Sequence, residues 1–423
     1  MLSVKITFSL FLIAILASLG HAQTKSTPYS PCISAPPLPL PTKNFVTVGS
    51  EPELYAAMKS LKKDMTVLIK PGRYQLRDTL GITVDNVTVR GLHNDCGSVE
   101  LIGNGMDNVK HGGVEHGFWI NASNTTIANL TISEVYFHTI QIEARARAPH
   151  IYNVRLVNSG QQFIKSNPKE YGQGVDNGVV EYSIMEYSDG PPVTNHDNSG
   201  IGYTNGVDIH AGSGWRISNN RFRNFHTPDN ADHLWNAAVL TWNGAVDTIT
   251  ENNVFIDVDR AIAYGLNKKN YDHKGGVIRN NMIVLSKNLF SSARARAADA
   301  PIIIWDSPGT KVIHNTVLTN GNMPNAIELR FESANIEVTN NLTDAAISHR
   351  DRKFFLKTNN LTTAKPNWFK NLLSGDLRLT PDATEALNQT RRHRFAETDV
   401  DGEKRPFGRK VDLGADELNQ NSG

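Results

Sequence analysis

Short apolar runs that stop at asparagine recur along most of the chain. TITENNVFID at 248 to 257 is one of them, and its variants are RISNNRFRNF at 216, VIRNNMIVLS at 277, KVIHNTVLTN at 311, IEVTNNLTDA at 336 and FLKTNNLTTA at 355. Each run has the length and the β-branched residues of a strand, and glycine, asparagine and proline separate the runs. The pattern predicts a protein built from β-repeats.

The asparagines mark a repeat of constant local sequence and variable length. They stand at Asn129, Asn153, Asn220, Asn253, Asn281, Asn315, Asn341 and Asn360, at intervals of 19 to 34 residues apart from one gap of 67. The gap holds VVEYSIMEYS at 179 to 188, which has serine and tyrosine where the other repeats have asparagine. Such spacing indicates loops of different length inserted into one repeated coil.

A right-handed parallel β-helix gives these asparagines a physical purpose. A sharp corner between two parallel sheets puts one residue into the left-handed conformation, which asparagine tolerates, and its amide can bond the asparagines of neighbouring coils. Barrels and propellers would instead show systematic hairpin turns or blades of even length, and the sequence has neither pattern. We predict an all-β, single-domain right-handed parallel β-helix of about 10–11 coils.

One amphipathic helix is predicted before the first coil. SEPE at 50 to 53 is a capping box with proline in the first turn, and apolar residues follow at helical spacing as far as Leu61. We expect this helix, at about 51–63, to cap the open end of the solenoid. The β-helix with its cap is predicted over 44–375, and a C-terminal tail over 376–423 is expected to pack on it or cap it.

Residues 1–22 have the features of an export signal. Lys5 precedes an apolar run from 6 to 19, and small residues precede the expected cleavage site after Ala22. The run is too short for a comfortable membrane span, so we expect a secreted or periplasmic protein that begins with a proline-rich lead over 23–43. In an oxidising compartment Cys32 and Cys96 are a candidate disulfide, although two cysteines can also remain separate buried thiols.

The near balance of positive and negative residues means that the net charge of the protein would not attract a highly charged partner. Lysine and arginine number 43 and aspartate and glutamate 42, so neither nucleic acid nor an anionic membrane is an expected partner. A charged ligand would have to be attracted locally, and we expect the protein to act as a monomer.

The chain resembles the secreted bacterial right-handed β-helix proteins of the pectate-lyase-like superfamily. The resemblance rests on the cap helix, on LIKPGRY in the first coil, on the asparagine coils and on the tail DVDGEKRPFGRKVDLGADE at 399 to 417. It implies the fold, whereas the superfamily contains lyases, hydrolases, epimerases and proteins without assigned activity.

The strand on the far side of each coil is predicted to carry the chemistry. Aligning the coils by their asparagines and applying strand alternation turns Ile142, Ile164, Ile209, Thr241, Ala263, Ile304 and Leu329 inward. The predicted outward column is Glu143, Lys165, His210, Trp242, Tyr264, Trp305 and Arg330, with Gln141, Phe163, Asp208, Leu240, Ile262, Ile303 and Glu328 beside it.

This column suits an acidic polysaccharide. Coils are spaced about 4.8 Å apart, close to the rise of one sugar, so aromatic faces could stack on sugar rings and charged groups could meet carboxylates. The predicted substrate-binding residues are Trp242, Tyr264, Trp305, Asp208, Arg145 and Glu328. The alternative is that the outward aromatics simply pack beneath a long loop.

The favoured hypothesis is a lyase that cleaves a uronate polysaccharide by β-elimination. Such an enzyme neutralises the carboxylate, removes the proton α to it and protonates the leaving oxygen. Lys165 is the candidate base, since crowding by arginines would disfavour its charged form, and His210 is the acid or an alternative base. Arg330 or Arg145 would hold the carboxylate, and Glu143 lies in the coil before Lys165.

Two other functions fit the fold. A glycoside hydrolase needs a pair of facing carboxyl groups, and Asp208 with Glu143 is the only pair that the alignment brings together. A non-catalytic glycan-binding protein would need the aromatics but neither Lys165 nor His210. The cofactor is unknown: calcium serves several lyases of this superfamily, and Asp208, Glu143 and Glu328 are oxygen donors, yet they form no compact cluster.

Overall fold

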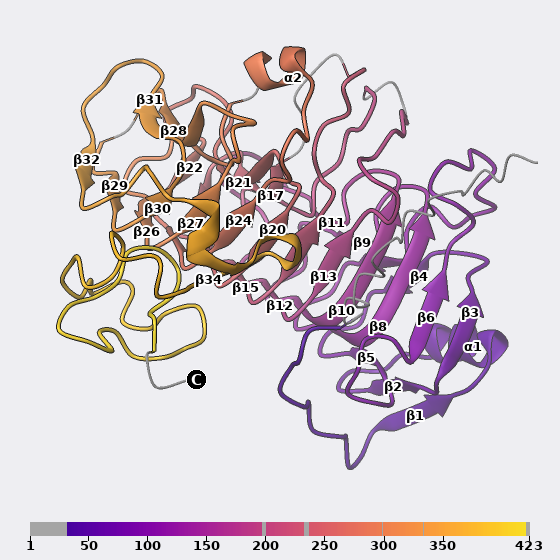
Figure 1. Cartoon of the computed structure of the whole chain (residues 1–423). Helices are drawn as coiled ribbons and strands as arrows, with labels where there is room; N and C mark the ends of the chain where they lie inside the picture. The colour runs from indigo at the N-terminus through magenta and orange to yellow at the C-terminus, as the bar shows by residue number, and fades with distance from the viewer. Residues whose placement is uncertain (1–31, 197–199, 232–236, 298, 333, 420–423) are drawn as a thin grey trace, which may run out of the picture. The chain divides into compact units, whose positions relative to one another are not determined.

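Parallel strands stacked coil upon coil recur through most of the described chain (Figure 1). The computed structural model describes residues 32–196, 200–231, 237–297, 299–332 and 334–419. The predicted export signal and the lead up to residue 31 therefore lie outside the described residues. No helix in the described ranges is both long and apolar enough to span a membrane.

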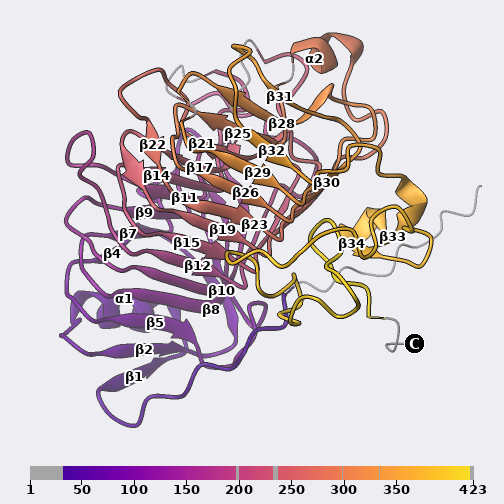
Figure 2. The same cartoon turned by 90° about the vertical axis from the view of Figure 1, so that its left-hand side faces the viewer.

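Ten strands of the described chain form one parallel sheet, called sheet 1 here, which carries the candidate site (Figure 2). In spatial order they are β4 (Leu80–Ile82), β7 (Phe118–Ile120), β9 (Ile140–Ile142), β11 (Ile164–Ser166), β14 (Val207–His210), β17 (Ala237–Trp242), β21 (Arg260–Tyr264), β25 (Ile302–Trp305), β28 (Asn325–Arg330) and β31 (Ala346–His349).

Two further series of parallel strands complete the coils. Sheet 2 contains β1 (Phe45–Val48), β2 (Thr66–Ile69), β5 (Thr88–Gly91), β8 (Thr126–Val135), β10 (His150–Ser159), β12 (Val179–Glu181), β15 (Arg216–Ser218), β19 (Ile249–Glu251), β23 (Val277–Arg279), β26 (Lys311–Ile313), β29 (Glu337–Thr339) and β32 (Leu356–Thr358). Sheet 3 contains β3 (Gly72–Gln75), β6 (Val99–Ile102), β13 (Ile184–Glu186), β16 (Arg221–Arg223), β20 (Val254–Ile256), β24 (Met282–Val284), β27 (Thr316–Leu318) and β30 (Leu342–Thr343). The long strands β8 and β10 bend and join both sheets.

A few short elements lie outside these sheets. They are the helices α1 (Glu51–Lys59) and α2 (Ser292–Ala297), the 3-10 helices η1 (Pro366–Trp368) and η2 (Leu372–Ser374), and the strand pairs β18 (Ala245–Val246) with β22 (His273–Lys274) and β33 (Phe369–Asn371) with β34 (Asp376–Leu379). The all-β parallel β-helix predicted from the sequence is confirmed.

The asparagine ladder forms the corner between sheets 2 and 3. Side-chain amides join Asn129 to Asn153, and Asn220, Asn253, Asn281, Asn315, Asn341 and Asn360 in succession, at 2.9 to 3.0 Å. In most of the later coils the corner consists of two consecutive residues. The first, such as Asn252 with φ 56°, has the left-handed conformation that turns the chain, and the second, such as Asn253, bonds the asparagines of the neighbouring coils. Ser183 takes the ladder position in the coil that lacks asparagine, because its backbone N–H donates to Asn220 Oδ1 at 2.9 Å.

Aliphatic side chains from the inner faces of the sheets fill the space between them. Ile142, Ile209, Ile304 and Leu329 of sheet 1 are all fully buried, as strand alternation predicted. Each such side chain stabilises the fold by about 1.5–3 kcal/mol relative to an exposed one. The inner faces therefore hold the sheets together, and the outer face of sheet 1 is available for polar groups.

The helix predicted at about 51–63 lies at Glu51–Lys59. The Glu53 N–H donates to Ser50 Oγ at 3.4 Å and the Glu53 carboxylate accepts from Gly49 N–H at 2.7 Å, which is the predicted capping box. Leu54 and Met58 are buried in the core of the first coils. That the helix serves as a cap of the solenoid stays a prediction.

A buried ion pair holds the C-terminal tail together, and a close backbone approach places the tail against sheet 3. Arg405, which is fully buried, bonds Glu417 at 3.0 Å and the Gly414 carbonyl at 3.0 Å. Gly414 approaches sheet 3 so closely, at φ 92°, that a Cβ there would lie 2.5 Å from Thr316 Oγ1. Arg405 and Glu417 thus fix the loop of the tail, and Gly414 lies against the β-helix.

Candidate functional site

The strand register of sheet 1 brings three of the predicted residues together on its outer face. Lys165 of β11 pairs with Asp208 of β14, and His210 pairs with Trp242 of β17. The sequence alignment had placed Lys165 level with His210, two residues further along. Residues two apart share a face of a strand, so Lys165, Asp208 and His210 all point outward despite that difference.

The side chains of these three residues are in direct contact. Lys165 Nζ lies 2.5 Å from Asp208 Oδ2 and 2.8 Å from His210 Nε2, and His210 Nε2 lies 3.2 Å from Asp208 Oδ2. The Lys165 and His210 side chains are 14% and 12% exposed, whereas that of Asp208 is 1% exposed. A small solvent-facing cluster of a lysine and a histidine therefore rests on a buried carboxylate.

Asp208 is held in its ionised form. Burial by itself would raise the pKa of Asp208, but the positive charges of Lys165 and His210 and their hydrogen bonds outweigh it and set the pKa well below the ordinary value. Trp242 Nε1 donates to the second oxygen, Asp208 Oδ1, at 2.9 Å. Both oxygens of the carboxylate are thereby engaged.

The arginines expected to crowd Lys165 are bound elsewhere. Arg145 Nη1 donates to the Asn121 carbonyl at 3.4 Å, and Arg147 lies 3.6 Å from Asp176. The charged group in direct contact with Lys165 is the carboxylate of Asp208, and the expectation that arginines act on Lys165 stays a prediction.

His210 is fixed by Asn243, which sequence reasoning did not identify, and by Trp242. Asn243 Nδ2 lies 2.8 Å from His210 Nδ1, and the ring of Trp242 lies 4.5 Å from the imidazole, centroid to centroid. Trp242 is partly exposed as predicted, yet its indole N–H serves Asp208. Asn243 comes directly after a strand of sheet 1, and that position is the signal that could have identified it.

Glu143 lies one coil before Lys165, as the sequence predicted. Its carboxylate accepts from Trp119 Nε1 at 2.9 Å, Gln141 Nε2 at 2.6 Å and Asn167 Nδ2 at 3.3 Å. These donors hold Glu143 as an anchored acceptor at the border of the cluster.

Tyr203 is a second group that the sequence did not single out. It interacts electrostatically with Lys165 and Asp208, and burial raises the pKa of its phenol further above neutrality. The phenol therefore keeps its proton at neutral pH, and it forms a side-chain hydrogen bond with Gln162.

Tyr264 points into the core, contrary to the prediction. It is fully buried, its hydroxyl donates to the Thr248 carbonyl at 2.9 Å, and it pairs with the inward Thr241 and Ile304 in the sheet. The true outward residue of β21 is Ala263, which the alignment had turned inward. The predicted facing of β21 is therefore wrong by one residue, which exchanges its inward and outward side chains.

Trp305 faces outward but is covered. It is 7% exposed and packs with Leu240, Ala263, Ile303 and Ala300 in a separate apolar cluster on the outer face of sheet 1. The alternative weighed from the sequence, that an outward aromatic packs beneath a loop, holds for this tryptophan. The prediction that the aromatic side chains form one solvent-exposed row along sheet 1 is therefore wrong.

Glu328 and Arg330 belong to this covered region as well. Glu328 is buried, pairs with Arg350 at 2.7 Å and accepts from Trp305 Nε1 at 3.3 Å. Arg330 stacks between the rings of Trp305 and Phe331 at 5.1 and 4.4 Å.

Arg330 cannot act on the same sugar as Lys165. Strand β28 is five positions from β11 in sheet 1, which corresponds to roughly 24 Å at the usual strand spacing. Arg145 is exposed and follows strand β9, which is the neighbour of β11 in sheet 1.

The oxygens suggested for calcium do not fit such an ion. Those of Asp208 and Glu143 accept from lysine, histidine, indole or amide donors, and Glu328 is paired with Arg350. Calcium requires six to eight oxygen ligands, whereas these carboxylates are separated and already occupied by N–H groups.

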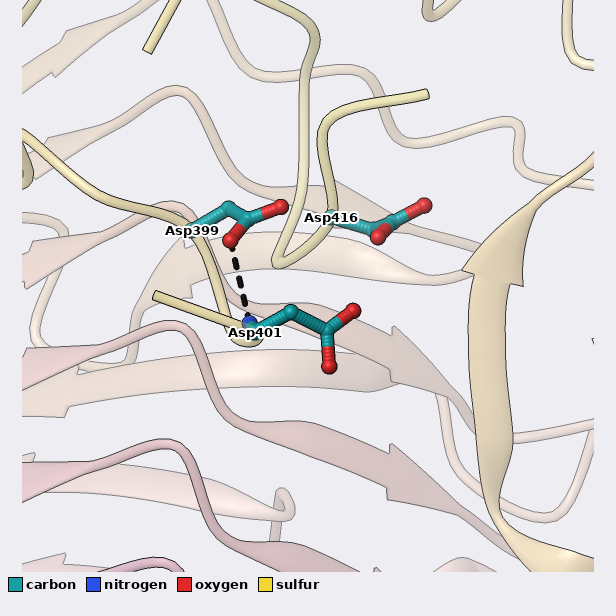
Figure 3. Close-up of side chains that lie close together, drawn as sticks. All are labelled: Asp399, Asp401 and Asp416. Atoms are coloured by element: carbon teal, nitrogen blue, oxygen red, sulfur yellow. Dashed lines mark hydrogen bonds between the residues drawn. The ribbon is translucent and has the colours of Figure 1, made fainter. Parts of the chain in front are cut away.

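One compact acidic group exists in the described chain, away from sheet 1. Figure 3 shows the carboxyl groups of Asp399, Asp401 and Asp416 near one another in the C-terminal tail. Arg378 donates to both oxygens of Asp401 at 2.7 Å, and backbone N–H groups donate to Asp399 and Asp416. The group is explained by these protein donors and therefore carries no argument for a cation.

Comparison with known proteins shows the fold. No protein-family model matches the sequence, and no curated protein matches it. The solved structure of pectate lyase Pel9A superimposes with a TM-score of 0.54 at 14% identity, over 86% of this chain and 90% of that one.

Two other solved structures are similar in the same way. The alginate lyase from Paenibacillus sp. str. FPU-7 has a TM-score of 0.49 at 13% identity, over 75% of this chain and 99% of that one. A rhamnogalacturonan lyase has a TM-score of 0.49 at 10% identity, over 80% and 97%. At such identities the likeness concerns the fold alone.

Proposed function

We propose that this chain, which has the parallel β-helix fold of the pectate-lyase-like superfamily, cleaves a uronate-containing polysaccharide by β-elimination. The observation that carries the proposal is the contact of Lys165 with both Asp208 and His210 on the solvent side of sheet 1. Lys165 is hydrogen-bonded to a histidine and to an ionised carboxylate, and the carboxylate would stabilise the ammonium group that forms when Lys165 takes up a proton.

Lys165 is the base in this proposal. The Nζ lone pair takes the proton α to the uronate carboxylate, and the electron pair of the broken C–H bond forms the new carbon–carbon double bond. The β carbon–oxygen bond breaks, and the leaving oxygen receives a proton. Asp208, at 2.5 Å, stabilises the ammonium group that forms, and Trp242 keeps Asp208 in place.

Tyr203 is proposed to protonate the leaving oxygen. Its phenol keeps its proton at neutral pH and lies within the electrostatic reach of Lys165 and Asp208. His210, predicted from the sequence as the acid, is better placed to exchange a proton with Lys165 at 2.8 Å. Arg145 is proposed to hold the carboxylate of the substrate, since it is exposed in the adjacent coil and, unlike Arg147, has no carboxylate partner among the ion pairs of the described residues.

The state of the two carboxyl groups counts against hydrolysis. Glycoside hydrolases need one carboxylic acid that is protonated at the working pH. Asp208 is ionised and engaged at both oxygens, and Glu143 accepts three hydrogen bonds. Neither is arranged as a proton donor.

Export of the protein is part of the proposal and rests on residues 1–22 alone. Intact-mass measurement of protein recovered from outside the cytoplasm tests it. A mature chain that begins just after Ala22 is expected, and an uncleaved N-terminus would contradict export by this signal.

The function is tested by incubating the purified protein with a panel of uronate polymers. Ultraviolet absorbance from unsaturated chain ends is the expected result with at least one polymer. New reducing ends without absorbance would indicate a hydrolase, a changed uronate configuration without cleavage would indicate an epimerase, and tight binding without either would indicate a glycan-binding protein. Each of these three results would contradict the proposal that the protein is a lyase.

A further inference from the structure

Arg330 is an outward arginine of sheet 1 that has no acidic partner. It is the last residue of β28 and lies in register with Trp305 of β25. Among the described residues its side chain forms neither an ion pair nor a hydrogen bond, and its Nε atom is buried without a partner. A half-buried guanidinium in this state lacks the anion that such groups usually bind.

The charges around Trp305 leave that of Arg330 uncompensated. Three guanidinium groups lie over the Trp305 ring, at 5.7, 5.1 and 5.1 Å from its centre, and they belong to Arg260, Arg330 and Arg350. Two carboxylates of the described chain pair with them. Asp299 pairs with Arg260 and Arg350, and Glu328 pairs with the latter at 2.7 Å. Within these contacts the group has one positive charge in excess, and Arg330 is the arginine that no carboxylate pairs with.

Two aromatic rings hold the Arg330 guanidinium in place. It lies 5.1 Å from the centre of the Trp305 ring and 4.4 Å from that of Phe331. Phe331 has the left-handed conformation at φ 63°, which is unfavourable for a bulky residue. The same corner in the three preceding coils holds residues that adopt this conformation readily, namely Asn243, Gly265 and Asp306. Strained residues of this kind are typical of binding sites, and here the strain places a ring against a positive group.

Partly exposed apolar side chains lead from the Lys165 cluster to Arg330. Trp242, Leu266 and Phe331 are half-buried and pack against the apolar cluster that contains Trp305. They come from β17, from the second residue after β21 and from the residue after β28, so they follow the order of the strands in sheet 1 (Figure 2). Such side chains suit the apolar faces of sugar rings.

We propose that Arg330 forms a distal subsite, which binds the carboxylate of a uronate about five sugars away from the one that Lys165 attacks. The inference rests on the proposed function, because it takes the acidic polysaccharide to lie across the strands of sheet 1. Strands β11 and β28 are five positions apart, and five strand spacings of about 4.8 Å match five sugars of similar rise. A guanidinium can give two parallel N–H groups to one carboxylate.

The distal subsite determines the length of chain that the protein recognises. A polymer that contacts both Lys165 and Arg330 must contain about six consecutive sugars, by the same strand spacing. The protein therefore acts within long uronate chains in preference to short oligosaccharides.

The inference is tested by calorimetric titration of the Lys165→Met protein, so that cleavage does not interfere, with oligomers of galacturonate, mannuronate and guluronate. We expect the octamer of at least one series to bind about tenfold more tightly than its tetramer. Arg330→Gln in the same background should reduce this advantage to about twofold. Arg352→Gln, at an exposed arginine after β31, is the matched control and should keep the tenfold advantage.

Two further arms separate the proposed contact from a general change of structure. Methyl-esterified octamers, which carry no charge, should bind no more than about twofold more tightly than methyl-esterified tetramers. Phe331→Asn accepts the left-handed backbone and should fold as its parent does by circular dichroism. Its octamer advantage should fall to about threefold, because the guanidinium loses one of its two rings.

Equal affinities for octamer and tetramer in the Lys165→Met protein would overturn the inference, and so would a full advantage in the folded Arg330→Gln variant or with esterified oligomers. Octamers that bind with the expected advantage while the wild type produces no unsaturated ends would overturn the proposed function alone. Failure of every series to bind would overturn both.

Discussion

Asp208 is the residue on which the proposed chemistry depends most, because it is a buried carboxylate that stays ionised. Folding lowers its pKa, so the carboxylate stabilises the folded state above the ordinary pKa of aspartate, about 3.9, and this contribution is lost as pH falls toward the lower value in the folded protein. The charge that stabilises an ammonium on Lys165 is therefore also a source of stability.

Asp208→Asn should reveal that contribution as a pH-dependent loss. At neutral pH we expect the variant to unfold with about 2–4 kcal/mol less free energy than the wild type. The difference should shrink below about pH 4, because the carboxylate then takes up a proton in the unfolded chain while it stays ionised in the folded protein. Urea unfolding of both proteins between pH 2 and 7 measures it, and a difference that does not vary with pH would contradict the account.

Single residues are also where sequence reasoning failed. In the coil of β21 the residues Ala261, Ile262, Ala263 and Tyr264 are all apolar, so no alternation of polar and apolar positions fixed which face points inward. Tyr264 could enter the core because Thr248 and Thr250 satisfy its hydroxyl there. Where one face was clearly polar, as for Lys165 and His210, the facing was predicted correctly.

The asparagine ladder is the element that the sequence revealed most completely. The spacing of the asparagines, their inward amides and the serine of one coil could all be predicted from the sequence. Every coil needs a similar residue at the same corner, so the pattern recurs along the chain. The loops follow no repeat. Coverage of Trp305, and the contact of Asn243 with Lys269, arise from segments outside the repeated strands and so could not be read from the sequence.

Asn281→Ala should show how much one rung of the ladder contributes. Its buried amide bonds Asn253 and Asn315 and also donates to the Thr250 carbonyl. We expect a loss of about 2–4 kcal/mol in the free energy of unfolding, since the partners are left unsatisfied in the core.

Asn367→Ala is the control for this measurement. Asn367 is exposed in η1, and its replacement should change stability by less than about 0.5 kcal/mol. Denaturant unfolding compares the two variants, and equal effects would mean that the ladder contributes nothing particular.

At the scale of the whole molecule, a disulfide ties the lead to the body of the β-helix. Cys32 and Cys96 are bonded, so the alternative of two separate thiols is excluded. The bond closes a loop of 64 residues and should stabilise the fold by about 2–4 kcal/mol.

Reduction should therefore lower the midpoint of unfolding for the wild type. The Cys32→Ala, Cys96→Ala double variant should already have the lower midpoint and should not respond to a reducing agent. A wild type that keeps its midpoint after verified reduction would contradict the expectation.

The tail gives the molecule a second pH response of opposite sign. Burial raises the pKa of Asp416 to about 7, and Asp399 and Asp401 beside it act in the same direction (Figure 3). A carboxyl group with a raised pKa stabilises the fold while protonated, and this stability is lost as pH rises from about 4 to 7.

Asp416→Asn should remove that loss. Near pH 4 the variant and the wild type should have the same free energy of unfolding. At pH 7 that of the variant should be higher by about 1–3 kcal/mol, and the difference should stay constant above pH 7. Thermal unfolding across this range checks it, and a lead that is largest at low pH would show that the sign is wrong.

The central claim is that Lys165 removes the proton α to a uronate carboxylate. Its most direct test is the rate of ultraviolet absorbance on a cleaved polymer for Lys165→Met beside Lys169→Met, an exposed lysine four residues further along. We expect the first variant to lose at least about 1000-fold in rate, as removal of a general base typically does, and the second to keep the wild-type rate. A folded Lys165→Met protein that produces unsaturated ends at the wild-type rate would contradict the account.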